Sequence, residues 1–321
     1  MLRFLVIYQH GRSRSIDKRT QGRNSRIREE ISDLADLKNS KTGVAMQCSR
    51  KEAIERLPEE ARQIRIEILK MLHASGSGHT GGSLSAADLL TALFFTELRH
   101  RPKEPGWADR DRFVLSKGHA APLYYALLAR FGYFKAEELG HLRKMSCMLQ
   151  GHPDSKSTPG VEISTGSLGQ GLSIANGMAL GLRLEKKDAR AYVLLGDGEI
   201  QEGMVWEAAM TSAHYKIDNL CAICDRNGLQ IDGAVDDVMG IEPLADKWEA
   251  FGWNVINIDG HRFEEILGAY EAARETRGKP TIIIARTIKG KGVSIFENKV
   301  KYHGLAPSDE ELEQAFRELG Q

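Results

Sequence analysis

The chain has 321 residues, 41% of them hydrophobic and 27% charged, so it is long enough to bury a large core. Its 44 basic and 44 acidic residues balance, which argues against nucleic acid or an anionic membrane as the main partner. No apolar run approaches the roughly 18 residues of a membrane-spanning helix. Four scattered cysteines suggest no disulfide framework, so a reducing cytoplasm is the expected location.

The first 45 residues differ in character from the rest of the chain. Positions 1–28 carry eight Lys or Arg residues and one acid, and the apolar run at 4–8 is too short for a signal-peptide core. We expect residues 1–45 to be a disordered or leader-like extension. Residues 46–321 are expected to form the functional domain.

The pattern becomes periodic from Lys51 onward. Apolar residues recur at helical spacing up to a glycine-rich stretch at 74–82, and Ser85, with Asp88 three residues later, has the spacing of a capping box for a second helix. The elements expected after these are a strand at 113–115, helices at 122–131 and 172–184, strands at 191–195 and 220–224, a helix at 244–251, a strand at 253–258, a helix at 263–276, a strand at 281–285 and a last helix capped by Ser308. This alternation predicts an α/β fold, with a parallel twisted sheet and helices on both faces.

Polar turns follow two of the expected strands. Gly196-Asp197-Gly198 comes directly after the run at 191–195, and Asn227 comes shortly after the run at 220–224. Open α/β sheets bind ligands at the carboxyl ends of their strands. A carboxylate, an amide oxygen and a nearby main-chain carbonyl are ligands that Mg²⁺ takes, with phosphate oxygens completing the octahedron. The pairing therefore predicts a Mg²⁺ site at Asp197 and Asn227 that would hold a diphosphate.

Three other motifs are better explained without function. Glycines at 76, 78 and 81 match a dinucleotide fingerprint, but a helix precedes them where that fingerprint needs a strand. Cys221 and Cys224 lie three apart in an apolar strand, so they should face opposite sides as buried thiols. The turn at 289–292 reads as a basic surface turn.

Four histidines, at 79, 119, 152 and 303, each lie beside glycine in an expected loop. Glycine lets a ligand approach the backbone, and imidazole can bind sugar hydroxyls or phosphate and move protons near neutral pH. A solvated loop histidine is the ordinary alternative for each one alone. The histidines expected to be structural are His73, His100, His141, His214 and His261.

Taken in order, these motifs resemble the diphosphate-binding domain of thiamine-diphosphate enzymes, whose signature is Gly-Asp-Gly with Asn some 30 residues on. The chain is most similar to the transketolase family, from about residue 50 to its end. The stretches that carry the resemblance, besides 196–198, are 77–84, 111–120, 151–153, 165–171, 227–233 and 301–304. Thr80 departs from the pattern, because many relatives have proline there.

The resemblance implies binding roles. Asp197, Asn227 and the main-chain carbonyl of Leu229 would ligate Mg²⁺. The residues that would contact thiamine diphosphate are His119, Gly166, Ser167, Leu168, Gly198, Asn227 and His303.

It also implies catalytic roles for three of the four histidines. His79, His152 and His303 would face the sugar, orient its hydroxyls and move protons during ketol transfer. Glu202 and Glu207 match acidic positions near a dimer contact that connects two active sites.

Full-length members of the family continue with a pyrimidine-binding domain, which carries the glutamate that activates the cofactor, and with a C-terminal domain. Because this sequence stops after its last capped helix, it resembles the N-terminal subunit of a split transketolase. The expected partner is a C-terminal subunit, in an α2β2 assembly acting on sugar phosphates. The alternatives are another thiamine-dependent half-enzyme, of the 2-oxo acid dehydrogenase α or deoxyxylulose-phosphate synthase kind, and a non-catalytic cofactor-binding subunit.

Overall fold

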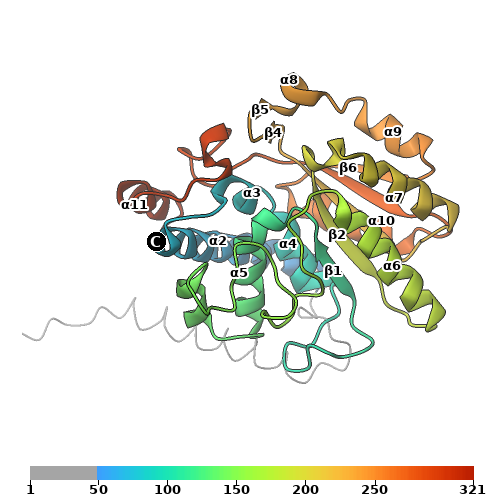
Figure 1. The fold of residues 1–321 in the computed structure, drawn as a ribbon, viewed down its shortest axis with the longest axis horizontal. Helices are drawn as coiled ribbons and strands as arrows, with labels where there is room; N and C mark the ends of the chain where they lie inside the picture. Colours follow the sequence, from blue (N-terminus) through green and yellow to red (C-terminus); the bar gives the residue numbers. More distant parts are fainter. Residues whose placement is uncertain (1–48) are drawn as a thin grey trace, which may run out of the picture. The chain divides into compact units, whose positions relative to one another are not determined.

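The computed structural model describes residues 49–321, and the expectations for residues 1–45 and Cys48 lie outside this range (Figure 1). Its centre is a five-stranded sheet in the spatial order β1-β2-β3-β7-β6, in which every pairing is parallel. The strands are β1 (Arg112–Leu115), β2 (Ala191–Gly196), β3 (Leu220–Arg226), β7 (Thr281–Arg286) and β6 (Asn254–Asp259). All five lie within two residues of the predicted positions, so the α/β prediction is confirmed.

The pairing of β2 with β3 determines where the two polar turns lie. Gly196 is the register partner of Asp225, so the segments that leave the two strands start side by side. β2 is buried throughout and β3 is buried up to Asp225, which explains the continuous apolar runs in the sequence.

Helices pack against both faces of the sheet, as predicted (Figure 1). The main helices whose buried residues share one core cluster are α2 (Arg50–Ser75), α4 (Ala87–Ala92), α5 (Ala121–Phe131) and α10 (Phe263–Glu275). Those of the other cluster are α6 (Gln170–Leu184), α7 (Gly203–His214) and α9 (Leu244–Ala250). Cys221 belongs to the first cluster and Cys224 to the second, which confirms that these buried thiols face opposite sides.

Short elements connect the main helices and strands. They are α3 (Thr80–Ser85), η2 (Leu93–Glu97), η3 (Gly118–Ala120), η4 (Ala136–His141), η5 (Glu199–Gln201), β4 (Leu229–Gln230), β5 (Gly233–Ala234), α8 (Val235–Met239), η6 (Val300–His303) and α11 (Asp309–Glu318). Within residues 49–321, none of the helices combines the length and apolar character needed to cross a membrane.

Helix caps show one confirmed prediction and one error. Ser308 and Glu311 form the predicted capping box at the start of α11. Ser85, by contrast, caps no helix: it is the last residue of α3, and α4 begins after Ala86 without a side-chain cap. Ser85 is itself helical and its hydroxyl donates to Asp225, while Asp88, the other half of the expected box, is bound by Arg65 and His261.

Candidate active site

The ends of β2 and β3 are joined by Asp197. Its carboxylate is almost fully buried and accepts the amide of Gly198 at 2.8 Å and the amide of Gly228 at 2.6 Å. Since Gly228 follows β3, this carboxylate links the two turns that the sequence predicted to meet. Each carboxylate oxygen of Asp197 keeps a second lone pair that could bind a cation.

Asn227 and Leu229 supply the other two predicted metal ligands, and each already has a polar contact. The side-chain oxygen of Asn227 accepts the amide of Leu229 at 3.2 Å, and its amide nitrogen donates to Asp225 at 3.3 Å. The carbonyl of Leu229 accepts a hydrogen bond from Lys289 Nζ at 3.0 Å. No group of three or more His, Cys, Asp or Glu side chains suited to a metal occurs in the described chain, so a metal here would depend on amide and carbonyl oxygens.

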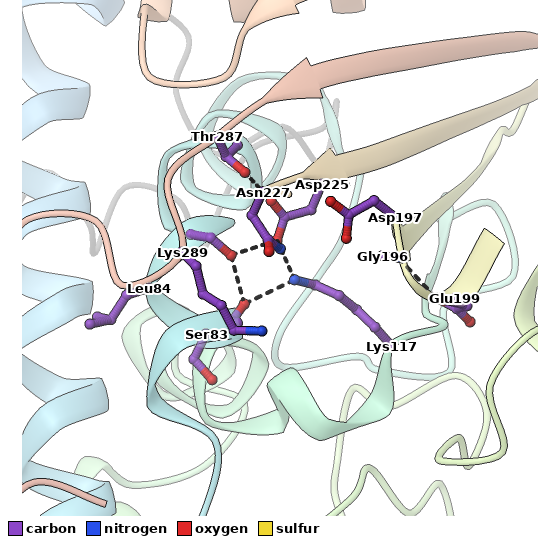
Figure 2. A network of polar contacts seen from close by, with 12 residues as sticks. Ser83, Leu84, Lys117, Gly196, Asp197, Glu199, Asp225, Asn227, Thr287 and Lys289 are labelled. Carbon is purple, nitrogen blue, oxygen red and sulfur yellow. Dashed lines mark hydrogen bonds and ion pairs between the residues drawn. The ribbon is translucent and has the colours of Figure 1, made fainter. Parts of the chain in front are cut away.

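A buried ion pair lies directly beside these groups (Figure 2). Lys117, in the turn after β1, donates to Asp225 at the end of β3, with side-chain exposures of 2% and 0%. Asp225 also accepts the hydroxyls of Ser85 and Thr287. Burial opposes the ionised form, but Lys117 and these donors outweigh it and lower the pKa of Asp225.

A third buried carboxylate, Glu199, holds the loop expected to line the cofactor. It accepts the amides of Gly169 at 2.9 Å and Gly196 at 3.0 Å, and also the hydroxyl of Ser116. These contacts connect the loop at 165–169 to the ends of β1 and β2. The expected cofactor residues Gly166 and Leu168 are half-buried in this loop, and Ser167 is exposed.

The structure brings the four glycine-flanked histidines together. The ring centroid of His79 lies 5.1 Å from that of His119, 5.5 Å from His303 and 6.3 Å from His152. His119 and His303 are 5.2 Å apart. They come from four separate segments, so a chance arrangement of solvated loop residues does not explain the cluster.

Glycines lie close to the imidazole rings of this cluster, so no side chain covers the backbone there. A Cβ at Gly82 would lie 3.4 Å from His119 Nε2, and one at Gly166 would lie 3.1 Å from the His152 ring. Gly166 also has a φ of +149°, which favours glycine. The Nδ1 atom of His79 is buried and finds no hydrogen-bond partner within residues 49–321. An unpaired buried nitrogen beside bare backbone is what a site for a polar ligand would show.

Burial and nearby cations keep the histidines neutral. Burial, with Arg143 nearby, lowers the pKa of His79 to about 4. Burial, with Lys289 nearby, lowers the pKa of His303 to about 3. The pKa values of His119 and His152 are lowered by burial as well. At neutral pH each imidazole therefore has one unprotonated ring nitrogen that can accept a hydrogen bond, and in His303 this nitrogen, Nδ1, already accepts one from Lys289.

Lys289 was wrongly placed on the surface by sequence reasoning. Lys289 is only 2% exposed, and its Nζ atom contacts Leu229 O at 3.0 Å and His303 Nδ1 at 2.9 Å. Burial, followed by the charge of Lys117, lowers the pKa of Lys289 to about 8. Burial and the charge of Asp225 raise the pKa of Asp197 to about 6. Because Lys117 is paired with Asp225, it is Lys289 that adds positive charge close to the predicted diphosphate site.

The remaining expected residues lie at the periphery. Glu202 is exposed and lies against the loop at 165–169, where a Cβ at Gly169 would be 2.8 Å from its Cβ. Glu207 lies on an exposed face of α7. Sequence reasoning missed Lys117, Glu199 and Asp225; the only available signal was that all three come at the ends of buried strands.

Comparison with known proteins identifies the family. A family model described as the transketolase thiamine diphosphate binding domain matches residues 58–321. The chain belongs to this family. Among its relatives is the 6-deoxy-6-sulfo-D-fructose transketolase subunit of Clostridium sp. (strain MSTE9), 45% identical over 82% of this chain and 96% of the relative. Another is an apulose-4-phosphate transketolase subunit of Phocaeicola vulgatus, 41% identical over 84% of this chain and 95% of the relative.

Longer transketolases match over part of their length. Human transketolase is 42% identical over 83% of this chain, which spans 42% of the human protein. The crystal structure of Campylobacter jejuni transketolase superposes with a TM-score of 0.79 at 37% identity, covering 83% of this chain and 43% of that one. Both the transketolase resemblance and the similarity to separate transketolase subunits are thereby confirmed.

Proposed function

We propose that this chain is the N-terminal subunit of a two-subunit transketolase. With a separate subunit that carries the pyrimidine-binding and C-terminal domains, it transfers a two-carbon ketol unit from a ketose phosphate to an aldose phosphate. The observation that carries the proposal is the meeting of four neutral histidines beside the turns of Asp197 and Asn227. The free cysteines among the described residues agree with action in a reducing cytoplasm.

The residues present fit thiamine diphosphate and Mg²⁺. Asp197, Asn227 and the carbonyl of Leu229 would hold the metal, and Lys289, which lies at that carbonyl, would supply positive charge to the diphosphate. Gly198 and His119 would contact the diphosphate, and the loop at 166–168 would line the cofactor. The cofactor supplies a carbon nucleophile that accepts the ketol unit.

The histidines would bind and orient the sugar. His79 and His152 present neutral imidazoles at neutral pH, so each could accept a proton from a sugar hydroxyl and return it. His303, whose Nδ1 accepts from Lys289, would orient the sugar through the hydrogen on Nε2. The Nδ1 atom of His79, which has no hydrogen-bond partner among the described residues, would form a hydrogen bond with a sugar hydroxyl. Glu202 and Glu207 would lie at a contact between subunits, where exposed carboxylates can pair across the interface.

Reconstitution tests the proposal. The purified chain is mixed with the separately encoded pyrimidine-domain subunit from the same genome, Mg²⁺, thiamine diphosphate and a panel of ketose and aldose phosphates. Ketol transfer should require both subunits, and Asp197→Ala should abolish it. Asp246→Ala, at an exposed position of α9, is the control and should leave transfer unchanged. A complete mixture that transfers no ketol unit from any donor would contradict the proposal.

A further inference from the structure

Lys289 lies on a turn whose backbone is anchored on all sides. The Gly290 amide donates to Gly81 O at 3.0 Å, and the carbonyl of Lys289 accepts the amide of Asn298 at 2.9 Å. Side chains supply further anchors: Glu297 accepts the Gly292 amide at 3.0 Å, and two others bind the backbone on either side of Lys289. The Ile288 amide donates to His261 Nε2 at 2.9 Å, and Arg65 Nε donates to the carbonyl of Lys291 at 3.0 Å.

These two side chains belong to one buried unit. Arg65, from α2, binds Asp88, from α4, through two hydrogen bonds of 2.7 and 2.8 Å. His261, in the turn between β6 and α10, completes the unit through Nδ1, which lies 2.8 Å from the same carboxylate. The side chains of Arg65, Asp88 and His261 are 7%, 8% and 13% exposed. Burial alone would raise the pKa of Asp88, but Arg65 and His261 overcome it and lower that pKa to about 2.

The contacts of His261 determine its tautomer. Because Nε2 accepts a hydrogen bond from the Ile288 amide, it cannot itself carry a hydrogen, and the hydrogen of the ring must be on Nδ1. Nδ1 therefore donates to Asp88. A direct chain of hydrogen bonds thus runs from Arg65 through Asp88 and His261 to the backbone amide of Ile288, the residue before Lys289.

We infer that Arg65, Asp88 and His261 form a positioning unit that sets where the Lys289 ammonium lies in the active site. The inference rests on the proposed function, because the ligand that Lys289 would meet is the phosphate end of the bound cofactor. None of the three residues touches that site itself. They hold the turn at both ends, at Ile288 N and Lys291 O, and Lys289 extends from between these points toward Leu229 and His303.

His261 is the residue to vary, since removing either member of the buried Arg65–Asp88 pair would endanger folding itself. His261→Gln places an amide oxygen near the position of Nε2 and keeps an acceptor for Ile288. His261→Asn places its amide nitrogen near the position of Nδ1, so it keeps the bond to Asp88 and loses that acceptor. The matched control is His73→Asn, which alters another histidine–carboxylate contact, to Asp309, that is not connected to Lys289.

The first measurement is hydrogen–deuterium exchange of the 286–292 segment in the full chain, without any ligand. In His261→Asn the Ile288 amide should exchange about tenfold faster than in wild type, the effect of one lost hydrogen bond, whereas His261→Gln and His73→Asn should leave it protected. Equal exchange in wild type and His261→Asn would overturn the inference.

The second measurement is a double-mutant cycle by calorimetry, with thiamine diphosphate and Mg²⁺ as the titrated ligands. His261→Asn should weaken binding about tenfold in the wild-type background and less than twofold in Lys289→Met, because the effect acts through Lys289. Additive effects would overturn the inference. A wild-type chain that binds no cofactor, alone or with its partner subunit, would contradict the proposed function instead, and the exchange measurement would still decide whether His261 holds the turn.

Discussion

Replacing Asp225 with asparagine should destabilise the protein strongly, although the two side chains have the same shape. Asp225 is fully buried and is the ion-pair partner of Lys117, whose side chain is 2% exposed. Asp225→Asn leaves a buried ammonium without a counter-charge. Breaking a buried pair in this way costs about 3–5 kcal/mol in the free energy of unfolding.

Replacing Lys117 together with Asp225 should recover part of the lost free energy of unfolding. In Lys117→Met, the carboxylate keeps three neutral donors, from Ser85, Thr287 and Asn227, so we expect this variant to be less destabilised than Asp225→Asn. The double variant should be more stable than Asp225→Asn alone by about 2 kcal/mol, because no unpaired charge remains buried.

Urea denaturation followed by circular dichroism measures these differences at constant m value. Asp246→Asn, on the exposed side of α9, is the control and should lie within about 0.5 kcal/mol of wild type. The reasoning fails if Asp225→Asn costs less than about 1 kcal/mol, or if the two single effects simply add in the double variant.

Three further predictions concern other parts of the molecule. Burial lowers the pKa of His100 to about 4, so its stabilising contribution is present above pH 6.5 and is lost as the pH falls toward 4. His100 alone should contribute about 3 kcal/mol to the fall in the free energy of unfolding over that range, and equilibrium unfolding at several pH values should show a fall smaller by about this amount in His100→Phe; identical slopes would contradict the prediction. Gly290→Ala should lower the melting temperature much more than Gly278→Ala: both glycines have positive φ, +81° and +74°, but a Cβ at Gly290 would overlap a main-chain carbonyl, whereas at Gly278 it would meet open space. Equal shifts in scanning calorimetry would show that steric overlap is not the cause. In the reconstituted enzyme, His79→Ala should lower kcat about 100-fold while His141→Ala leaves it unchanged, and a steady-state assay in which both variants keep full kcat would remove His79 from the proton transfers.

The sequence was most informative where burial leaves a simple pattern. β2 and β3 are buried on both faces, so they appear as apolar runs, and their parallel pairing explains why Asp197 and the segment of Asn227 meet. The glycine neighbours of the four histidines also marked segments that converge on one place.

The predictions that failed concern residues whose tertiary contacts outweigh the local sequence pattern. The turn of Lys289 carries charge and glycine, which suggests exposure, yet Gly81 leaves room for the lysine stem and the side chain is buried. Ser85 has the spacing of a helix cap, but Asp225 takes its hydroxyl. The structural role expected of His261 agrees with its contacts, but no local pattern reveals that these are with Asp88 and the distant Ile288 amide.

The most direct test of the central claim is the position of the metal. Crystals of the assembled enzyme are grown with thiamine diphosphate and with Mn²⁺ in place of Mg²⁺, and diffraction is recorded at the manganese absorption edge. The account predicts one strong anomalous peak about 2.1–2.2 Å from oxygens of Asp197, Asn227 and Leu229. A cofactor bound with the metal elsewhere, or with no peak between these turns, would contradict it.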